Sequence, residues 1–114
     1  MADNLKMIRG TSNTFKILVV DKNGDPYNLA SEEVLVFGIK HRPYIDDAAV
    51  VKTTTSGTNG IYTVDLHPDD TLGLKYGNYF WDAGIRVGED YYPLFREPGV
   101  FVILANATKW GDGK

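Results

Sequence analysis

The amino-acid sequence predicts a single all-β domain, folded as an antiparallel sandwich of short strands. Turn-forming residues recur about every ten residues, which is the spacing of strands in a sandwich or barrel. Val, Ile and Thr are frequent, and the chain holds seven Tyr, five Phe and two Trp, residues that suit pleated, half-buried surfaces. A chain of 114 residues commonly folds around one core, so we expect one domain over residues 1–114.

The first half of the chain reads as strands separated by turns. Residues 5–9 fit a short edge strand, whereas residues 14–21 are apolar on both faces and fit a central strand. An Asn-Gly pair within residues 21–26 predicts a tight reversal, because both residues tolerate the left-handed conformation. Residues 34–41 form the next strand, which ends before Pro43 because proline has no N–H for a ladder.

The middle of the chain continues this pattern. Residues 49–55 are a β-branched run, and residues 56–60 hold a second Asn-Gly turn. Apolar and polar side chains alternate strictly over residues 61–66, which predicts a strand with one face on the core and one face in water. Residues 68–73 carry proline and acidic residues at a helix start, and predict one short helical turn.

The last third of the chain predicts two hairpin strands, a final strand and a tail. Residues 79–87 alternate with Trp81 on the apolar side, so we expect Trp81 at the centre of the core. A turn then leads into residues 91–94, and the last strand covers residues 100–104. The tail, residues 106–114, is polar and rich in glycine, and we expect it to be flexible.

Composition narrows the classes of function. The formal net charge is −3 and the basic residues are spread along the chain, which disfavours nucleic acid as a partner. The absence of cysteine excludes disulfides, thiolate nucleophiles and cysteine-bound zinc. The sequence shows neither a signal-peptide pattern nor the roughly 18 apolar residues that span a bilayer, so we expect synthesis in the cytoplasm and no membrane insertion.

Candidate catalytic and metal-binding groups are scattered rather than clustered. His41 and His67 lack the spacing of a zinc site and fit solvent-facing strand ends. The loop at residues 21–25 resembles a calcium loop only superficially, since Lys22 and Pro26 disturb the order of ligands. Four acidic pairs fall in predicted turns, where solvated carboxylates are common: Glu32-Glu33, Asp46-Asp47, Asp69-Asp70 and Glu89-Asp90. We therefore expect no catalytic residue, no metal, no cofactor and no enzymatic activity.

Aromatic residues near the C-terminus are the candidates for binding. Tyr91, Tyr92 and Trp110 are interface candidates, because Tyr and Trp anchor interfaces out of proportion to their number. Packing in the core competes with this role for Tyr92 and for Phe95.

The order of short motifs along residues 9–104 resembles a family of phage proteins. The pieces are RGTSNTFKI at 9–17, DKNGDPYNL at 21–29, VLVFGIK at 34–40, NGIYTV at 59–64, LHPDDT at 66–71, YGNYFWDA at 76–83 and PGVFVI at 98–103. This series is similar to small immunoglobulin-like structural domains of phages and prophages, such as the N-terminal domain of tailed-phage baseplate upper proteins. Ser12-Asn13 replaces a usual Asp, and Ala83-Gly84 interrupts a usual Asp-Ile, which suggests a bulge there.

The resemblance implies an immunoglobulin-like sandwich of about seven or eight strands. It also implies a non-enzymatic structural protein of the virion, associated with the tail or baseplate. Its partners would be other copies of itself or neighbouring tail proteins, met through protein–protein contacts in assembly. The family supplies no catalytic or binding motif that can be transferred to this chain.

Two other functions remain open at this point. The aromatic residues, with Asp and Asn in loops, are consistent with a carbohydrate-binding sandwich module that recognises host surface glycans. A small hydrolase with paired carboxylates is the third hypothesis, with Asp65 and Asp82 as the carboxylates in predicted strands.

Overall fold

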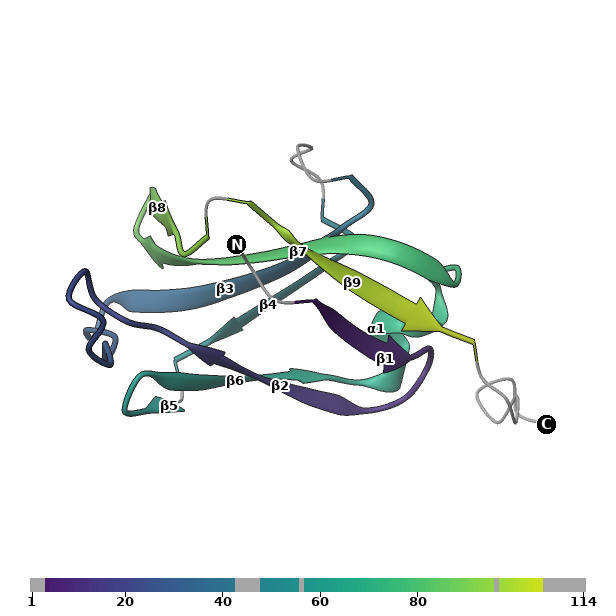
Figure 1. Ribbon diagram of the computed structural model, residues 1–114, viewed down its shortest axis with the longest axis horizontal. Helices are drawn as coiled ribbons and strands as arrows, with labels where there is room; N and C mark the ends of the chain where they lie inside the picture. The colour runs from purple at the N-terminus through teal and green to yellow at the C-terminus, as the bar shows by residue number, and fades with distance from the viewer. Residues whose placement is uncertain (1–3, 43–47, 56, 96, 106–114) are drawn as a thin grey trace.

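Two β-sheets pack face to face in the computed structural model, which describes residues 4–42, 48–55, 57–95 and 97–105 (Figure 1). The larger sheet has the strand order β1-β9-β7-β3-β4, with β8 paired to the far half of β7. Its strands are β1 (Leu5–Ile8), β9 (Gly99–Leu104), β7 (Gly77–Val87), β3 (Glu33–Lys40), β4 (Val50–Thr54) and β8 (Asp90–Pro93). The all-β prediction is therefore confirmed.

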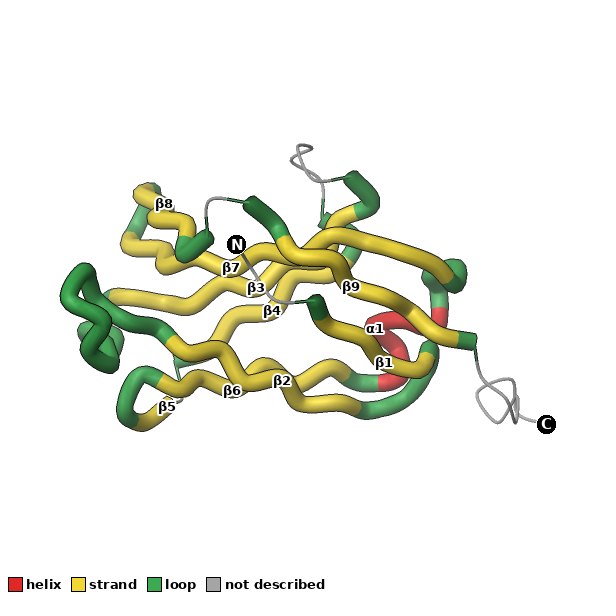
Figure 2. Tube along the Cα trace, in the orientation of Figure 1, coloured by secondary structure: helices red, strands yellow, loops and turns green. Residues whose placement is uncertain are grey.

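The smaller sheet has the order β2-β6-β5, formed by β2 (Asn13–Leu18), β6 (Ile61–Leu66) and β5 (Gly57–Thr58). One short helix, α1 (Pro68–Leu72), connects β6 to β7 where the sequence predicts a helical turn. Figure 2 shows this helix at the end of the sandwich where β1 and β9 also end. Every pair of strands in the described residues is antiparallel except β1 and β9, which run parallel.

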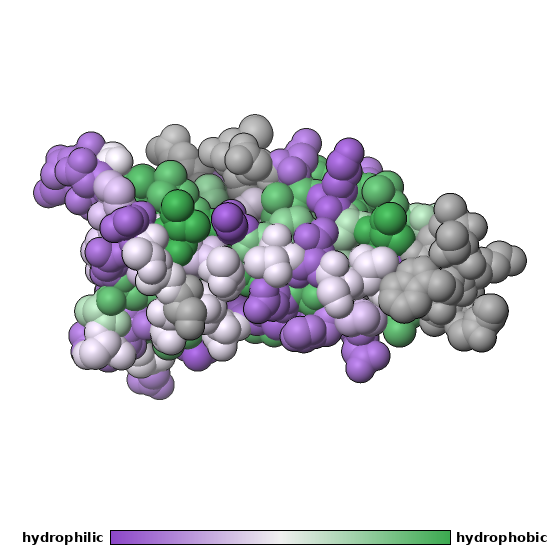
Figure 3. Space-filling view, turned by 90° about the horizontal axis from the view of Figure 1, so that it is seen from below, coloured by the Kyte–Doolittle hydropathy of each residue, from purple (hydrophilic) through white to green (hydrophobic). Residues whose placement is uncertain are grey.

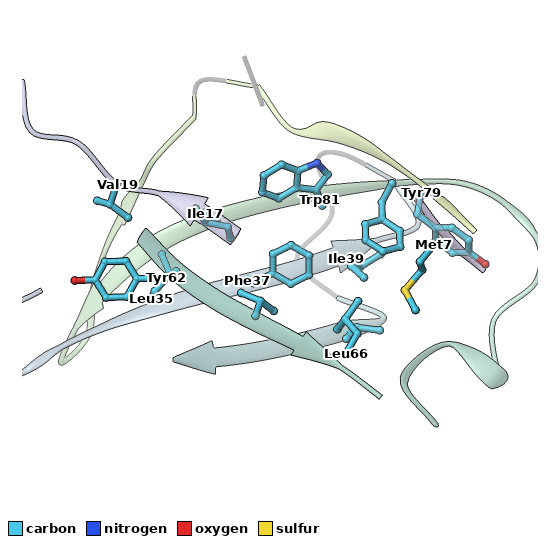
Figure 4. Packing of buried hydrophobic residues seen from close by; sticks show 14 of the residues in the cluster. Met7, Ile17, Val19, Leu35, Phe37, Ile39, Tyr62, Leu66, Tyr79 and Trp81 are labelled. Carbon is cyan, nitrogen blue, oxygen red and sulfur yellow. The ribbon is translucent and has the colours of Figure 1, made fainter. Parts of the chain in front are cut away.

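The core lies between the inner faces of the two sheets. Trp81 is 4% exposed, as predicted, and its ring packs against Phe37 and Phe95 at centroid distances of 5.6 and 5.4 Å. Figure 4 shows the core side chains of both sheets pointing toward one another. The alternating apolar positions of β3, β6 and β7 supply most of this core, because successive side chains of a strand point to opposite faces.

The predicted central position of residues 14–21 is wrong. In the structure β2 is an edge strand that pairs with β6 alone, and it ends at Leu18. The inner side chains are buried as the alternation requires, but the outer ones, Leu18 and Val20, are 57% and 45% exposed. The apolar side chains on the outer face of this strand are therefore exposed, and no second layer covers them in the described residues.

The predicted bulge at Ala83-Gly84 is also wrong. The register between β3 and β7 runs without interruption from the Glu33 and Val87 pair to the Lys40 and Phe80 pair. The glycine is a consequence of packing instead, because a β-carbon at Gly84 would lie 2.4 Å from the Tyr91 ring.

Both predicted Asn-Gly turns reverse the chain, but in the first of them Gly24, with a φ angle of 85°, is left-handed and Asn23 is not. Asn59 and Gly60 have φ angles of 54° and 79°, as a two-residue hairpin turn requires. In the turn after β2, the Asp21 carboxylate accepts hydrogen bonds from the backbone N–H groups of Asn23 and Asp25, at 2.8 and 3.0 Å. That carboxylate closes the turn, which explains the residues that resemble a calcium loop.

A candidate binding groove on the larger sheet

The tyrosines that sequence analysis selected lie on opposite faces of β8. Tyr91 is opposite Arg86 and faces outward, whereas Tyr92 is opposite Ile85, on the side that faces the smaller sheet. Both are exposed, Tyr91 by 46% and Tyr92 by 58%, so packing in the core does not explain Tyr92. The structure therefore does not bring the two rings into one surface, and Trp110 lies outside the described residues.

A hollow of about 200 Å³ lies on the outer face of the larger sheet, next to Tyr91. We call it the β3–β7 groove; it is lined by Val36, Gly38, Lys40, Ala48, Val51, Asp82 and Tyr91. In the register of β3 with β7, Gly38 is opposite Asp82 and Gly84 is opposite Val36. Tyr91 covers Gly84, and Gly38 is buried as well, with Asp82 Oδ1, the Val50 carbonyl oxygen and the Ala48 β-carbon within 4 Å of where its β-carbon would lie.

A pair of opposite charges lies at the groove. The Lys40 ammonium and the Asp82 carboxylate are 3.7 Å apart, with side chains 21% and 33% exposed. This distance is too long for a hydrogen bond, so the pair itself leaves the ammonium donors and carboxylate acceptors free for other groups. Burial, followed by the negative charge of Asp82, raises the pKa of the Tyr91 hydroxyl, which keeps this ring neutral.

A second and larger hollow, of about 580 Å³, lies beside the end of α1 and is lined by Arg9, Leu74, Lys75 and Tyr76 among others. Its charged group has a structural role. Arg9 Nε donates a hydrogen bond of 2.9 Å to the Leu74 carbonyl, and its guanidinium also donates to the Leu72 carbonyl. These contacts cap the carbonyl end of the helix, where a positive charge is stabilising.

Two of the acidic pairs are explained by local contacts. Glu33 accepts hydrogen bonds from the Tyr27 hydroxyl and from the Ala30 N–H, at 2.8 and 2.7 Å, and thereby fixes the loop before β3. Asp70 forms an ion pair of 2.9 Å with Lys52 and accepts a hydrogen bond of 2.7 Å from the His67 N–H. The Glu89-Asp90 pair is in the β7–β8 hairpin, and Asp46-Asp47 lies outside the described residues.

Metal-ligating side chains do not converge in the part of the chain that the structure describes. No group of three or more His, Asp or Glu residues there is placed to hold an ion. His41 packs beside the Tyr79 ring, with centroids 5.1 Å apart, and His67 precedes α1. Asp65 and Asp82 lie on the outer faces of different sheets, so they do not form a catalytic pair of carboxylates.

Apolar side chains are exposed on the outer face of the smaller sheet. Leu18 and Ile61 are cross-strand partners, and Val20 follows on the same side of the chain. These three residues, which we call the β2–β6 patch, are 57%, 44% and 45% exposed. Figure 3 views this face, and its apolar side chains form separate groups, one of them toward the left-hand end where β5 and the turn after β2 lie.

The β3–β7 groove was not predicted from the sequence. Gly38 was not selected as a candidate residue, and Gly84 was interpreted as a sign of a bulge. The signal that was present is a glycine inside each of two apolar strands, with Lys40 and Asp82 each two residues from its glycine. The strand register that places these residues next to one another is seen only in the structure.

Comparison with family models, with curated proteins and with solved structures finds no match to this chain. Among the described residues, no helix is long and apolar enough to span a membrane.

Proposed function

We propose that this protein is a non-enzymatic structural protein of a phage or prophage virion, associated with the tail or baseplate, which acts through protein–protein contacts in assembly. The ordered motif series over residues 9–104 supports the phage assignment, since each motif resembles its counterpart in the same order. The proposed location is the virion, after synthesis in the bacterial cytoplasm.

The β2–β6 patch is the observation that carries the proposed contact. Leu18, Val20 and Ile61 place about half of each side chain in water, on one face and next to the edge strand of the smaller sheet. An open strand edge offers unpaired N–H and C=O groups, and natural proteins commonly cover such edges or use them for strand addition. A neighbouring virion protein that covers β2 would bury the patch and pair the edge in one contact.

Incorporation of the protein into particles tests this function. Particles released from the bacterium that carries the gene are purified, and the protein is quantified in them by mass spectrometry. We expect a fixed ratio of this protein to the tail proteins, and at least a tenfold lower ratio for Ile61→Lys.

Ile8→Lys is the matched control, because Ile8 and Ile61 are 45% and 44% exposed and both lie in strands. The control variant is expected to enter particles like the unmodified chain. Absence of the protein from particles would contradict the virion assignment, and equal losses in both variants would contradict the role of the patch.

A further inference from the structure

Arg9 borders the larger hollow, beside α1, and keeps hydrogen-bond donors that the fold does not use. A guanidinium has five N–H donors, and the Leu74 and Leu72 carbonyls accept from Nε and Nη2. Three of the five donors therefore remain, two of them on Nη1. The guanidinium carbon also lies over the Tyr76 ring, 5.6 Å from its centroid, which helps to hold the group in place. Arg9 is thus an ordered cation with free donors at the hollow.

The Lys75 ammonium is the second charge at this hollow. Lys75 is exposed, and the ion pairs formed among the described residues involve Lys40 and Lys52 instead. The described residues that line the hollow include two basic side chains and no acidic one: Arg9, Gly73, Leu74, Lys75 and Tyr76. Two positive charges that border one hollow, without a carboxylate beside them, attract an anion.

The size and the remaining lining of the hollow define what carries that anion. Its volume of about 580 Å³ lies within the roughly 300–1,000 Å³ of ligand sites and far exceeds that of a lone carboxylate. Leu74 and the Tyr76 ring, which is 55% exposed, add apolar surface. A ligand that uses both the charges and this surface is an anionic group attached to a larger body. Guanidinium donors pair with both oxygens of a carboxylate, and an ammonium adds a point charge.

We propose that this hollow, which we call the Arg9–Lys75 hollow, binds a Glu or Asp side chain of a peptide segment from a partner protein. The proposal rests on the proposed function, because carboxylates are the anions that a protein surface offers. The carboxylate lies between the Arg9 guanidinium and the Lys75 ammonium, and the rest of the segment lies against Tyr76 and Leu74. Figure 1 shows α1 and β5 at opposite ends of the smaller sheet, so the hollow and the β2–β6 patch are separate contacts.

A titration followed by NMR tests the proposal on the full chain. The probe is a blocked tripeptide with one glutamate between two alanines, and the matched peptide carries glutamine in its place. Sodium acetate and sodium phosphate, at the same ionic strength, supply free anions for comparison. With the glutamate peptide we expect saturable shifts of the amides of Leu74, Lys75 and Tyr76, with a dissociation constant in the millimolar range that small ligands reach. The glutamine peptide is expected to cause no such shifts, and the free anions to bind more weakly.

Substitutions remove single features of the site. Lys75→Gln removes a charge at an exposed position and is expected to weaken binding about fivefold, whereas Lys75→Arg retains binding. Arg9→Lys keeps the charge but loses the planar set of donors, and is also expected to weaken binding. The matched control is Lys22→Gln, which removes the same charge from an exposed position in the turn after β2 and is expected to leave binding unchanged.

Three results would overturn the proposal. One is that the glutamate peptide causes no saturable shifts at the hollow, or the same shifts as the glutamine peptide. Another is that acetate or phosphate binds as tightly as the glutamate peptide, since the hollow would then be a site for a free anion. The third is unchanged binding in Lys75→Gln, which remains a valid test if Arg9→Lys does not fold. A failed titration contradicts the hollow alone, whereas absence of the protein from particles contradicts the proposed function.

Discussion

At the scale of single residues, the contacts of Asp70 show how one side chain joins α1 to β4. Its carboxylate forms an ion pair with Lys52 of β4 and accepts a hydrogen bond from the His67 N–H at the start of α1. Burial of the carboxyl opposes its ionisation, but the hydrogen bond and the Lys52 charge outweigh burial and lower the pKa of Asp70. The ionised form of Asp70 therefore stabilises the fold.

The first prediction concerns acid stability. Because the pKa of Asp70 is lower in the folded state than the 3.8 of a free side chain, its contribution is present above that pH. The contribution is lost as the pH falls through the lower folded value. We expect Asp70→Asn to reduce the free energy of unfolding at neutral pH by about 1 kcal/mol and to flatten its fall below about pH 4.

Urea denaturation at a series of pH values measures both effects. The control is Asp69→Asn, which removes the same charge from the neighbouring residue of α1 but neither of these contacts. Equal effects of the two substitutions would contradict the assignment to the Asp70 contacts.

At the scale of elements, the turns and strand glycines determine where a side chain is tolerated. Gly60 has a φ angle of 79°, and a β-carbon there would lie 2.6 Å from the Val19 carbonyl oxygen. Gly38 has neither constraint. The same substitution is therefore expected to have opposite effects at the two positions.

The second prediction is that Gly60→Ala lowers the free energy of unfolding by about 2 kcal/mol, whereas Gly38→Ala leaves it unchanged or raises it by about 0.5 kcal/mol. The alanine at 60 strains the turn, and the alanine at 38 reduces the freedom of the unfolded chain. Thermal or urea denaturation measures the difference. A loss of more than about 1 kcal/mol for Gly38→Ala would show that the fold itself requires this glycine.

Sequence patterns predicted where strands and turns lie in the chain better than they predicted which strands pair with one another. Alternating side chains located β6 and β7, and the Asn-Gly pair located the turn at Gly60, because both signals are local. The edge position of β2 and the parallel pairing of β1 with β9 depend on segments far apart in the chain, which local patterns do not encode. The β3–β7 groove was missed for the same reason, because it exists only in the register that places Gly38 opposite Asp82.

At the scale of the whole molecule, one core joins the two sheets. Phe101 of the larger sheet is fully buried and contacts Phe15 of the smaller sheet, with ring centroids 5.6 Å apart, and Phe37 of its own sheet at 6.5 Å. Neither sheet keeps its apolar face covered without the other. Unfolding is therefore expected to be a single cooperative transition.

The third prediction is that Phe101→Ala lowers the free energy of unfolding by about 3–5 kcal/mol, as removal of a buried aromatic ring does. Circular dichroism of the strands and tryptophan fluorescence should report the same midpoint as each other, in the unmodified chain and in the variant. The control is Val102→Ala, the next residue on the outward face, with a loss of about 1 kcal/mol or less. Separate midpoints for the two probes would contradict a shared core.

The central claim is that the smaller sheet is the surface that assembles with other virion proteins. Hydrogen exchange of the protein in purified particles, compared with the free chain, tests it most directly, because pairing or covering of an edge slows exchange of its amides. We predict new protection in β2 (Asn13–Leu18) and none in β4 (Val50–Thr54), an edge strand of the larger sheet. Unchanged exchange in β2, or new protection confined to β4, would contradict the claim.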